Sequence, residues 1–224
     1  MTDPEPDEFM ARLGPADRAA LCARGRRRQW PTGASLFLEG EQCSTVMIVV
    51  SGRVKVFSLT ENGEEILLAV RGPGALLGEL SAVDGAPRSA SVAALEPVVA
   101  LVVPLRSFVE FMRQHGDAAI VLLQLVTSKL RDSDRKRVEG AAYDIAARVA
   151  RRLVELADRF GEPDGRGVRI AVALSQDELA GWVGASREAV AKALRVLRDR
   201  GFVTTGRRTM TVLDLERLRL RAEG

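Results

Sequence analysis

The sequence lacks any apolar run long enough to cross a bilayer and contains few cysteine, histidine and aromatic residues. A membrane-spanning helix needs about 20 consecutive apolar residues, and no stretch of the 224 residues approaches that length. Cys22 and Cys43 have no metal-ligand spacing and can form one bridge at most, which favours a reducing compartment. Residues 1–10 are acidic and proline-rich rather than signal-like, so we expect a cytoplasmic protein with no membrane partner.

What the chain does contain is the ordinary balance of a globular protein, with its positive charge gathered toward the C-terminal end. It is 46% hydrophobic and 28% charged, and its formal net charge is +3. Residues 142–224 carry 16 Lys and Arg against 12 Asp and Glu. Excess arginine on a short segment is consistent with phosphate binding, but a solvated helix face has the same composition.

Short apolar runs broken by glycine dominate residues 34–103 and predict a domain of many short strands. Asn62-Gly63 lies between two such runs and is typical of a type I′ hairpin turn. Strands at spacings near ten residues favour an antiparallel barrel or roll over alternating β–α units. Residues 8–30 are expected to form one or two short helices that end in the basic stretch 24–28. The predicted strands cover residues 35–38, 46–50, 53–59, 65–70, 89–94 and 98–103.

A long helix is predicted from about residue 117 to 138, after a short amphipathic stretch near Phe108. Along it, six residues at alternating spacings of four and three form a coiled-coil seam, which favours a homodimer. A second apolar edge, residues 121, 122 and 125, is expected to pack on the roll. The alternative is one buried helix in a monomer. The seam consists of Ala119, Leu123, Val126, Leu130, Ser133 and Arg137.

Gly140 is expected to interrupt that helix and to place a hinge near residues 138–144. A further amphipathic helix follows over 142–160, then a plain turn over 162–167 and a short strand over 168–171. Two close helices are predicted next, over 175–182 and 186–200. Each begins with an N-cap serine, and the tight turn Val183-Gly184-Ala185 between them is of the helix-turn-helix type. Residues 202–213 form a predicted hairpin, and a last short helix covers 214–222.

The second helix of this pair exposes polar side chains near its N-terminus, the end that contacts base edges when such a helix enters the major groove. Arginine can pair with guanine, and glutamate can accept from the cytosine amine. Serine and glutamine at helix N-termini are placed for phosphates. An ordinary charged helical hairpin is the alternative, but the following hairpin, with Arg207 and Arg208 at its tip, favours a winged helix. The candidate DNA-binding residues are Ser175, Gln176, Ser186, Arg187, Glu188 and Lys192.

The stretch GPGALLGELSAVDGAPRSASV, residues 72–92, is the second informative motif. Gly78 lets the backbone approach a ligand closely, and Glu79 offers a carboxylate that can accept from a sugar hydroxyl. Arg88 and Ser89 offer a cation, a hydroxyl and backbone N–H groups for a phosphate. A β-turn with a surface ion pair is the alternative.

Together these two motifs resemble the Crp/Fnr transcription regulators of the cyclic-AMP receptor type. Residues 175–203 resemble their winged helix-turn-helix, and Gly78-Glu79-Leu80 with Arg88-Ser89 resembles the phosphate-binding cassette of cyclic-nucleotide-binding domains. The resemblance implies an α+β fold: a cyclic-nucleotide-binding β-roll (double-stranded β-helix) over 1–116, a dimerisation helix over 117–139 and a winged helix-turn-helix over 140–224. Only two cysteines and one histidine, His115, which we expect at the surface, disfavour the iron–sulfur and haem branches.

The resemblance also implies roles for individual residues. Gly78, Glu79 and Leu80 are expected to hold the ribose of cyclic AMP or cyclic GMP, and Arg88 with Ser89 its phosphate. Family members read bases with residues at Arg187, Glu188 and Lys192, although many place arginine rather than lysine at the last position. Ser133 and Asp134 match the Thr-Ser pair that meets adenine.

Asp134 departs from that pair because it has a carboxylate in place of a hydroxyl. A carboxylate suits guanine, which presents two adjacent hydrogen-bond donors. An ion pair of Asp134 with a nearby arginine is the alternative. Cyclic AMP remains favoured by resemblance.

We expect a ligand-gated regulator and no enzyme, metal, haem or iron–sulfur cluster. The expected partners are double-stranded DNA with two-fold symmetry, a second copy of the chain, and RNA polymerase, for which residues 162–167 are a candidate contact loop. The main rival is a regulator whose roll binds no nucleotide and serves for dimerisation. A nucleotide-hydrolysing enzyme is a more distant rival, because no metal site is found.

Overall fold

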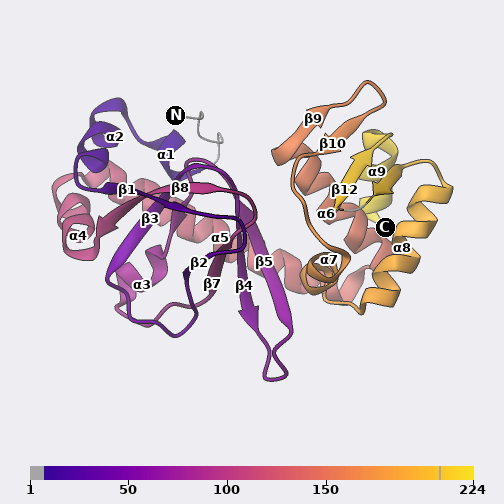
Figure 1. Cartoon of the computed structure of the whole chain (residues 1–224), viewed down its shortest axis with the longest axis horizontal. Coiled ribbons are helices and arrows are strands. Elements are labelled where there is room, and N and C mark those ends of the chain that lie inside the picture. The colour runs from indigo at the N-terminus through magenta and orange to yellow at the C-terminus, as the bar shows by residue number, and fades with distance from the viewer. Residues whose placement is uncertain (1–7, 207) are drawn as a thin grey trace. The chain divides into compact units, whose positions relative to one another are not determined.

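A computed structural model of the chain describes residues 8–206 and 208–224. The chain divides into two compact units, residues 1–58 with 68–132 and residues 59–67 with 133–224. The expected α+β fold, with a β-roll, a long helix and a C-terminal winged helix-turn-helix, is confirmed (Figure 1). Within the described residues, no helix is both long enough and apolar enough to cross a membrane.

Two four-stranded antiparallel sheets make up the roll. One has the order β1-β8-β3-β6 and the other the order β2-β7-β4-β5. Apolar side chains between them, among them Trp30, Val54 and Val92, form a buried core. The strands are β1 (Arg26–Trp30), β2 (Ser35–Phe37), β3 (Thr45–Ser51), β4 (Val54–Leu59), β5 (Glu65–Arg71), β6 (Leu76–Leu77), β7 (Ser91–Ala94) and β8 (Val98–Pro104).

A second core lies on the helical side of the first sheet. It combines Ile48 and Leu101 of the sheet with side chains of the helices, including Phe9, Phe108 and Leu122. The helices of this part are α1 (Phe9–Arg12), α2 (Pro15–Cys22), α3 (Glu79–Asp84) and α4 (Leu105–Gln114).

The basic stretch after α2 was expected to end a helix, and this expectation is wrong. Arg26–Trp30 form strand β1, which pairs with β8 at the edge of the first sheet. The first four side chains of β1 are exposed, so the strand has no alternation of apolar and polar residues that the sequence could reveal. Pairing with β8, which is distant in sequence, is what makes this segment a strand.

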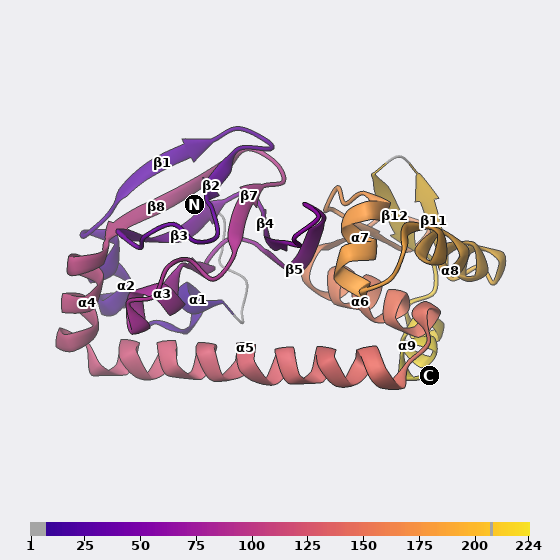
Figure 2. The same cartoon turned by 90° about the horizontal axis from the view of Figure 1, so that it is seen from below.

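The long helix α5 (Gly116–Ala142) is one unbroken helix of 27 residues, which Figure 2 shows along its length. It extends through Gly140, so the expected interruption there is wrong. Glycine costs about 1 kcal/mol in a helix, and ion pairs of the preceding residue hold this end of the helix in place. Glu139 is 5% exposed and forms ion pairs with Arg151 and Arg152.

The two faces of α5 differ largely as the sequence predicted, but Val126, expected in the seam, is partly buried and packs against the second core. Val121, Leu122 and Leu125 pack into the second core, whereas Leu123 and Leu130 are each 62% exposed. The alternative of one helix buried in a monomer does not account for this exposure. An apolar strip on α5 is therefore available to a partner.

The part of the second unit that follows α5 is the expected winged helix-turn-helix. The sheet has the order β11-β12-β10-β9, and β11 and β12 form the wing hairpin. Residues 161–163, expected partly as a plain turn, form strand β9 because they pair with β10. The elements are α6 (Ile145–Phe160), β9 (Gly161–Pro163), β10 (Val168–Ile170), α7 (Gln176–Val183), α8 (Arg187–Asp199), β11 (Val203–Gly206), β12 (Thr209–Val212) and α9 (Leu215–Glu223).

Candidate functional sites

Arg88 is a buried cation whose charge has no carboxylate partner in the described part of the chain. Arg88 is only 5% exposed. Nη1 donates to the carbonyl oxygen of Gly78 at 3.1 Å and Nη2 to that of Thr45 at 2.6 Å. The guanidinium also lies over the ring of Phe37, 4.2 Å from its centroid. Burying a charge against neutral acceptors is costly, so this guanidinium is a strong candidate for binding an anion.

Gly78 makes the position of that guanidinium possible. It has φ +78° and directly precedes helix α3. A Cβ at this position would lie 1.9 Å from Nη1 of Arg88 and 2.8 Å from its Cζ. Both the left-handed backbone and the close approach therefore require glycine. The sequence identified this glycine from its neighbours, but the contact with Arg88 is visible only in the structure.

The loop after α3 presents backbone donors next to Arg88. The backbone N–H groups of Ser89 and Ala90 make no hydrogen bond with any described residue. The loop itself is held in place, because the Arg88 N–H donates to the carbonyl of Glu41 and the Gly40 N–H donates to that of Arg88, each at 2.9 Å. A fixed loop with unpaired N–H groups beside a cation can bind a phosphate.

Glu79 is also buried, at 4% exposure, and its carboxylate is paired. Nζ of Lys129, on α5, lies 2.7 Å from Oε1 of Glu79. The sequence did not indicate Lys129, Thr45 or Phe37, because nothing in the local pattern shows which distant side chains meet the cassette. Leu80, the next residue on α3, is 38% exposed, and Ser89 is exposed.

Ser133 and Asp134 lie on α5 and are both exposed. Ser133 is one helical turn beyond Lys129 and so lies on the same face of that helix. The Asp134 carboxylate makes no hydrogen bond or ion pair with the described residues of its own chain. The alternative in which a neighbouring arginine of the same chain pairs with Asp134 is therefore not observed.

The helix-turn-helix is built around Gly184, which has φ +67° and ends α7. Nη1 of Arg148, on α6, donates to the carbonyl oxygen of Val183 at 2.8 Å and so holds the turn. The Ser175 hydroxyl accepts the N–H of Glu178 in a capping box, and that of Ser186 accepts the N–H of Ala189. The two serine hydroxyls thus start the helices, as their positions predicted.

One face of α8 is buried and the other is charged. Val190, Leu194 and Leu197 are at most 1% exposed and anchor the helix. The carboxyl of Glu188 is exposed and stays ionised at neutral pH. Its own backbone N–H lowers its pKa most, and the Ser186 hydroxyl lowers the pKa further. The exposed residues on and before α7 and α8 include Gln176, Ser186, Arg187, Glu188 and Lys192, whereas Ser175 is half-buried.

Around the helix pair, the wing adds an exposed Arg208 with φ +56° at the hairpin tip. Nη1 of Arg198 on α8 donates to the Thr205 hydroxyl of the wing at 2.7 Å, which fixes the hairpin to the helix. Arg207 lies outside the described residues. His115, expected at the surface, is half-buried instead, because Nδ1 lies 2.7 Å from Oδ1 of Asp17 and the ring stacks on Phe111.

A β-roll that contains a buried arginine, joined in one chain to a winged helix-turn-helix, defines a class of two-domain DNA-binding proteins. Residues 27–115 match the family described as cyclic nucleotide-binding domain, and residues 147–221 match the Crp-like helix-turn-helix domain. Among residues 8–206 and 208–224, no three or more His, Cys, Asp or Glu side chains are grouped so that they could hold a metal ion.

Similar proteins agree with this class. The chain is 33% identical over 222 residues to a CRP-like cAMP-activated global transcriptional regulator of Mycobacterium tuberculosis, covering 96% of this chain and 99% of the relative. It is 31% identical to the cyclic AMP receptor protein of Thermus thermophilus, with 90% of each covered. A solved CRP-family transcriptional regulator of that organism has a TM-score of 0.75 at 26% identity, covering 88% of this chain and 97% of the other.

The chain therefore belongs to the Crp family: it is a DNA-binding transcription regulator with an N-terminal cyclic-nucleotide-binding domain.

Proposed function

We propose that this chain is a homodimeric regulator that binds a two-fold symmetric DNA site when a cyclic nucleotide, cyclic AMP in preference to cyclic GMP, occupies its roll. The observation that carries the proposal is the buried Arg88 guanidinium, which lies beside Gly78 and the unpaired N–H groups of Ser89 and Ala90. A singly charged cyclic phosphate satisfies that cation and those donors together. The relatives named as cAMP-activated support cyclic AMP as the ligand.

Glu79 is the proposed contact with the ribose of the ligand. Its carboxylate can accept a hydrogen bond from a ribose hydroxyl while Lys129 balances its charge. Gating follows if the ligand binds one arrangement of the dimer better than the other, since a ligand shifts an equilibrium only by its differential affinity. Ser133 and Asp134, on the exposed part of α5, are the proposed contacts with the base.

Calorimetric titration with cyclic AMP tests this function through Arg88. Arg88→Leu removes the buried cation, and we expect a loss of about 1.5–3 kcal/mol in binding free energy, roughly 10- to 150-fold in affinity. Arg53→Leu, on the same roll but paired with Glu96, is the matched control and leaves affinity unchanged. If wild-type protein binds neither cyclic AMP nor cyclic GMP, the rival with a nucleotide-free roll is correct.

The same titrations with Asp134→Ser address the choice of purine. The carboxylate of Asp134 can accept from the two adjacent donors of guanine, whereas adenine presents one donor beside an acceptor. We expect wild-type protein to bind both nucleotides, and Asp134→Ser to shift the affinity ratio toward cyclic AMP. An unchanged ratio would place Asp134 outside the base site.

Dimer formation is proposed through the exposed strip of α5. Leu123 and Leu130 lie one heptad apart and are both exposed, as a coiled-coil seam requires. In a two-fold dimer Leu130→Asp sets a charge against its own copy, so we expect monomers in sedimentation velocity. Gln124→Asp, an exposed position of α5 outside the seam, is the control and retains the dimer. A dimeric Leu130→Asp protein would refute this interface.

RNA polymerase is the proposed further partner, through residues 162–167, which comprise the end of β9 and the turn that leads to β10. A two-fold DNA site follows from dimer symmetry, because two recognition helices related by an axis read two half-sites related by the same axis.

A further inference from the structure

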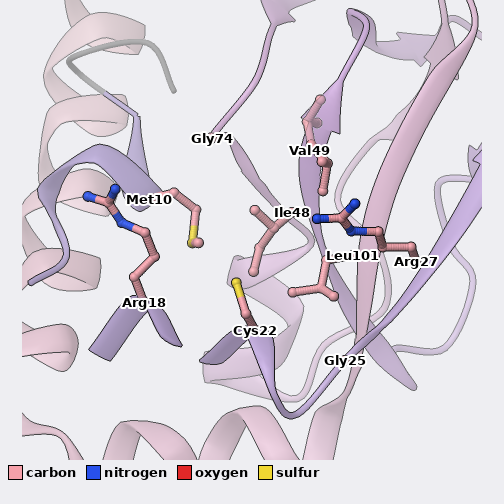
Figure 3. A pocket seen from close by; sticks show the side chains of 10 residues that line it. Met10, Arg18, Cys22, Gly25, Arg27, Ile48, Val49, Gly74 and Leu101 are labelled. Atoms are coloured by element: carbon pink, nitrogen blue, oxygen red, sulfur yellow. The ribbon is translucent and has the colours of Figure 1, made fainter. Parts of the chain in front are cut away.

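A cavity separate from the cassette lies between the N-terminal helices and the first sheet of the roll. Its volume is about 220 Å³. Met10 of α1 and Cys22 of α2 line it on one side, and Ile48 and Leu101 line it on the other. Figure 3 shows the sulfur atoms of both residues turned toward the space in front of the sheet.

The wall on the sheet side is one row of cross-strand neighbours. Arg27 on β1 pairs with Leu101 on β8, which in turn pairs with Ile48 on β3. Directly paired residues of antiparallel strands point to the same face, so the Arg27 side chain shares the face of the two apolar ones. Its neighbours on β1, Arg26 and Arg28, point to the other face. Figure 3 shows the Arg27 guanidinium reaching from β1 toward the cavity.

The charge at this cavity is positive. Its described lining contains two arginines and no carboxylate. Nη2 of Arg18 donates to the Leu13 carbonyl at 3.2 Å, but the Nε–H of Arg18 is buried with no partner among the described residues. The Arg27 side chain makes no hydrogen bond or ion pair with any described residue and is exposed. Long arginine stems lie along apolar walls while their charged ends stay at the opening.

Size and charge together define the ligand class. Pockets for drug-sized ligands measure about 300–1,000 Å³, so this cavity takes something smaller. An apolar cavity of about 150 Å³ holds benzene; one of 220 Å³ has room for an alkyl chain of roughly eight carbons. We propose that the cavity binds an alkyl carboxylate, with its chain among Met10, Ile48 and Leu101 and its head group on Arg27.

Protection of Cys22 from a maleimide tests the proposal on the full-length protein. Cys43→Ser removes the other thiol, so that labelling reports on Cys22 alone. The probes are octanoate, 1-octanol and octylammonium, which share the apolar chain and differ in head-group charge, each used below its micellar concentration. We expect octanoate to slow labelling at least fivefold at saturation, and octylammonium to leave the rate unchanged.

Arg27→Gln and Arg26→Gln form the matched pair, since the two residues are adjacent on one strand, equally charged and both exposed. Arg27→Gln should raise the octanoate concentration for half-protection about tenfold, as the loss of a charge-assisted hydrogen bond would. Arg26→Gln should leave it unchanged, and unaltered melting temperatures confirm the fold of both. The proposal fails if octanoate gives no protection, if the three probes protect alike, or if the two variants respond alike.

Discussion

The cassette of the roll and the recognition helix α8 both depend on an arginine, but they present it in opposite ways. Arg88 is 5% exposed and is held by two backbone carbonyls and an aromatic ring. The side chain of Arg187 is 65% exposed and makes a loose ion pair, 3.5 Å, with Asp177. Buried charges are conformationally fixed and coupled to the stability of the fold, whereas exposed charges are nearly free of it.

The comparison implies that substitutions in the cassette change folding and binding together, whereas substitutions on the exposed face of α8 change binding alone. A small charged ligand makes few contacts, so it supplies little binding energy for reorganising the protein. It therefore needs a site that is already ordered and desolvated before it binds. DNA supplies many contacts over a large surface and tolerates mobile side chains at each. Three predictions test this difference, from the largest expected effect to the smallest.

Gly78→Ala should have the largest effect. The new methyl group meets Arg88 in a left-handed backbone, so we expect a loss of about 2–4 kcal/mol in unfolding free energy and about 100-fold in cyclic AMP affinity. Urea denaturation and calorimetry measure the two losses. Gly85→Ala is the matched control, because Gly85 has φ +74° but open space around its Cβ position. It should cost only about 1 kcal/mol. Equal effects of the two variants would mean that Gly78 matters for backbone strain alone.

Arg187→Ala should weaken binding to a specific DNA site by about 1–3 kcal/mol and relax base preference at one position. Its unfolding free energy should stay within about 0.5 kcal/mol of wild type, because the side chain is exposed. Binding to specific and random DNA is compared by fluorescence anisotropy at one salt concentration. Arg195→Ala, exposed farther along α8, is the control and should weaken both DNAs alike. A loss of stability in Arg187→Ala would contradict the contrast with Arg88.

Asp144 is an intermediate case, an exposed carboxylate that supports the fold by capping α6. Its carboxylate accepts a hydrogen bond from the Ala147 N–H at 2.7 Å and forms an ion pair with Arg221. Both contacts lower the pKa of Asp144 from 3.8, and the Ala147 N–H has the larger effect. Asp144→Ala should therefore cost about 1 kcal/mol of stability at neutral pH. Asp199→Ala, at the C-terminal end of α8, should cost nothing measurable.

The pH dependence of that loss has a definite sign. Because the pKa of Asp144 is lower in the folded chain than in the unfolded chain, its stabilising effect is complete above the unfolded pKa. The effect disappears as the pH falls through the lowered value. Urea denaturation of wild type and Asp144→Ala should therefore give a constant difference in unfolding free energy from pH 7 to pH 5. That difference should shrink below about pH 4. A difference that grows on acidification would exclude the cap as its source.

Local patterns in the sequence were enough to predict the elements whose signals are short-range. The N-cap serines, Gly184 and the apolar positions of α8 predicted the helix-turn-helix, because caps and helical periodicity act within a few residues. The exposure of Leu123 and Leu130 on α5 followed from heptad spacing for the same reason, whereas the packing of Val126 against the roll did not. Gly78, Glu79 and Arg88 were predicted from resemblance to a known motif. By itself, one acid followed by Arg-Ser favoured a surface turn with an ion pair.

Strand β1, the continuation of α5 through Gly140 and the partners of the cassette could not be predicted in this way. Arg26–Gln29 have no apolar face, and only pairing with β8 makes them a strand. The ion pairs of Glu139 with α6 support the helix against the preference of Gly140. Lys129 meets Glu79 across fifty residues of sequence.

What the amino-acid sequence by itself determined about this protein is its order of modules: a glycine-punctuated roll, a seam-bearing helix and two capped helices before a hairpin. These depend on backbone preferences and periodicity, which are local properties of the chain. Tertiary structure alone decided that Arg88 is a buried cation without a carboxylate partner in the described chain, and that Arg27 faces an apolar cavity. Burial and charge pairing depend on which distant segments come together. Removal from water then sets how costly each unpaired charge is and how strongly it attracts a partner.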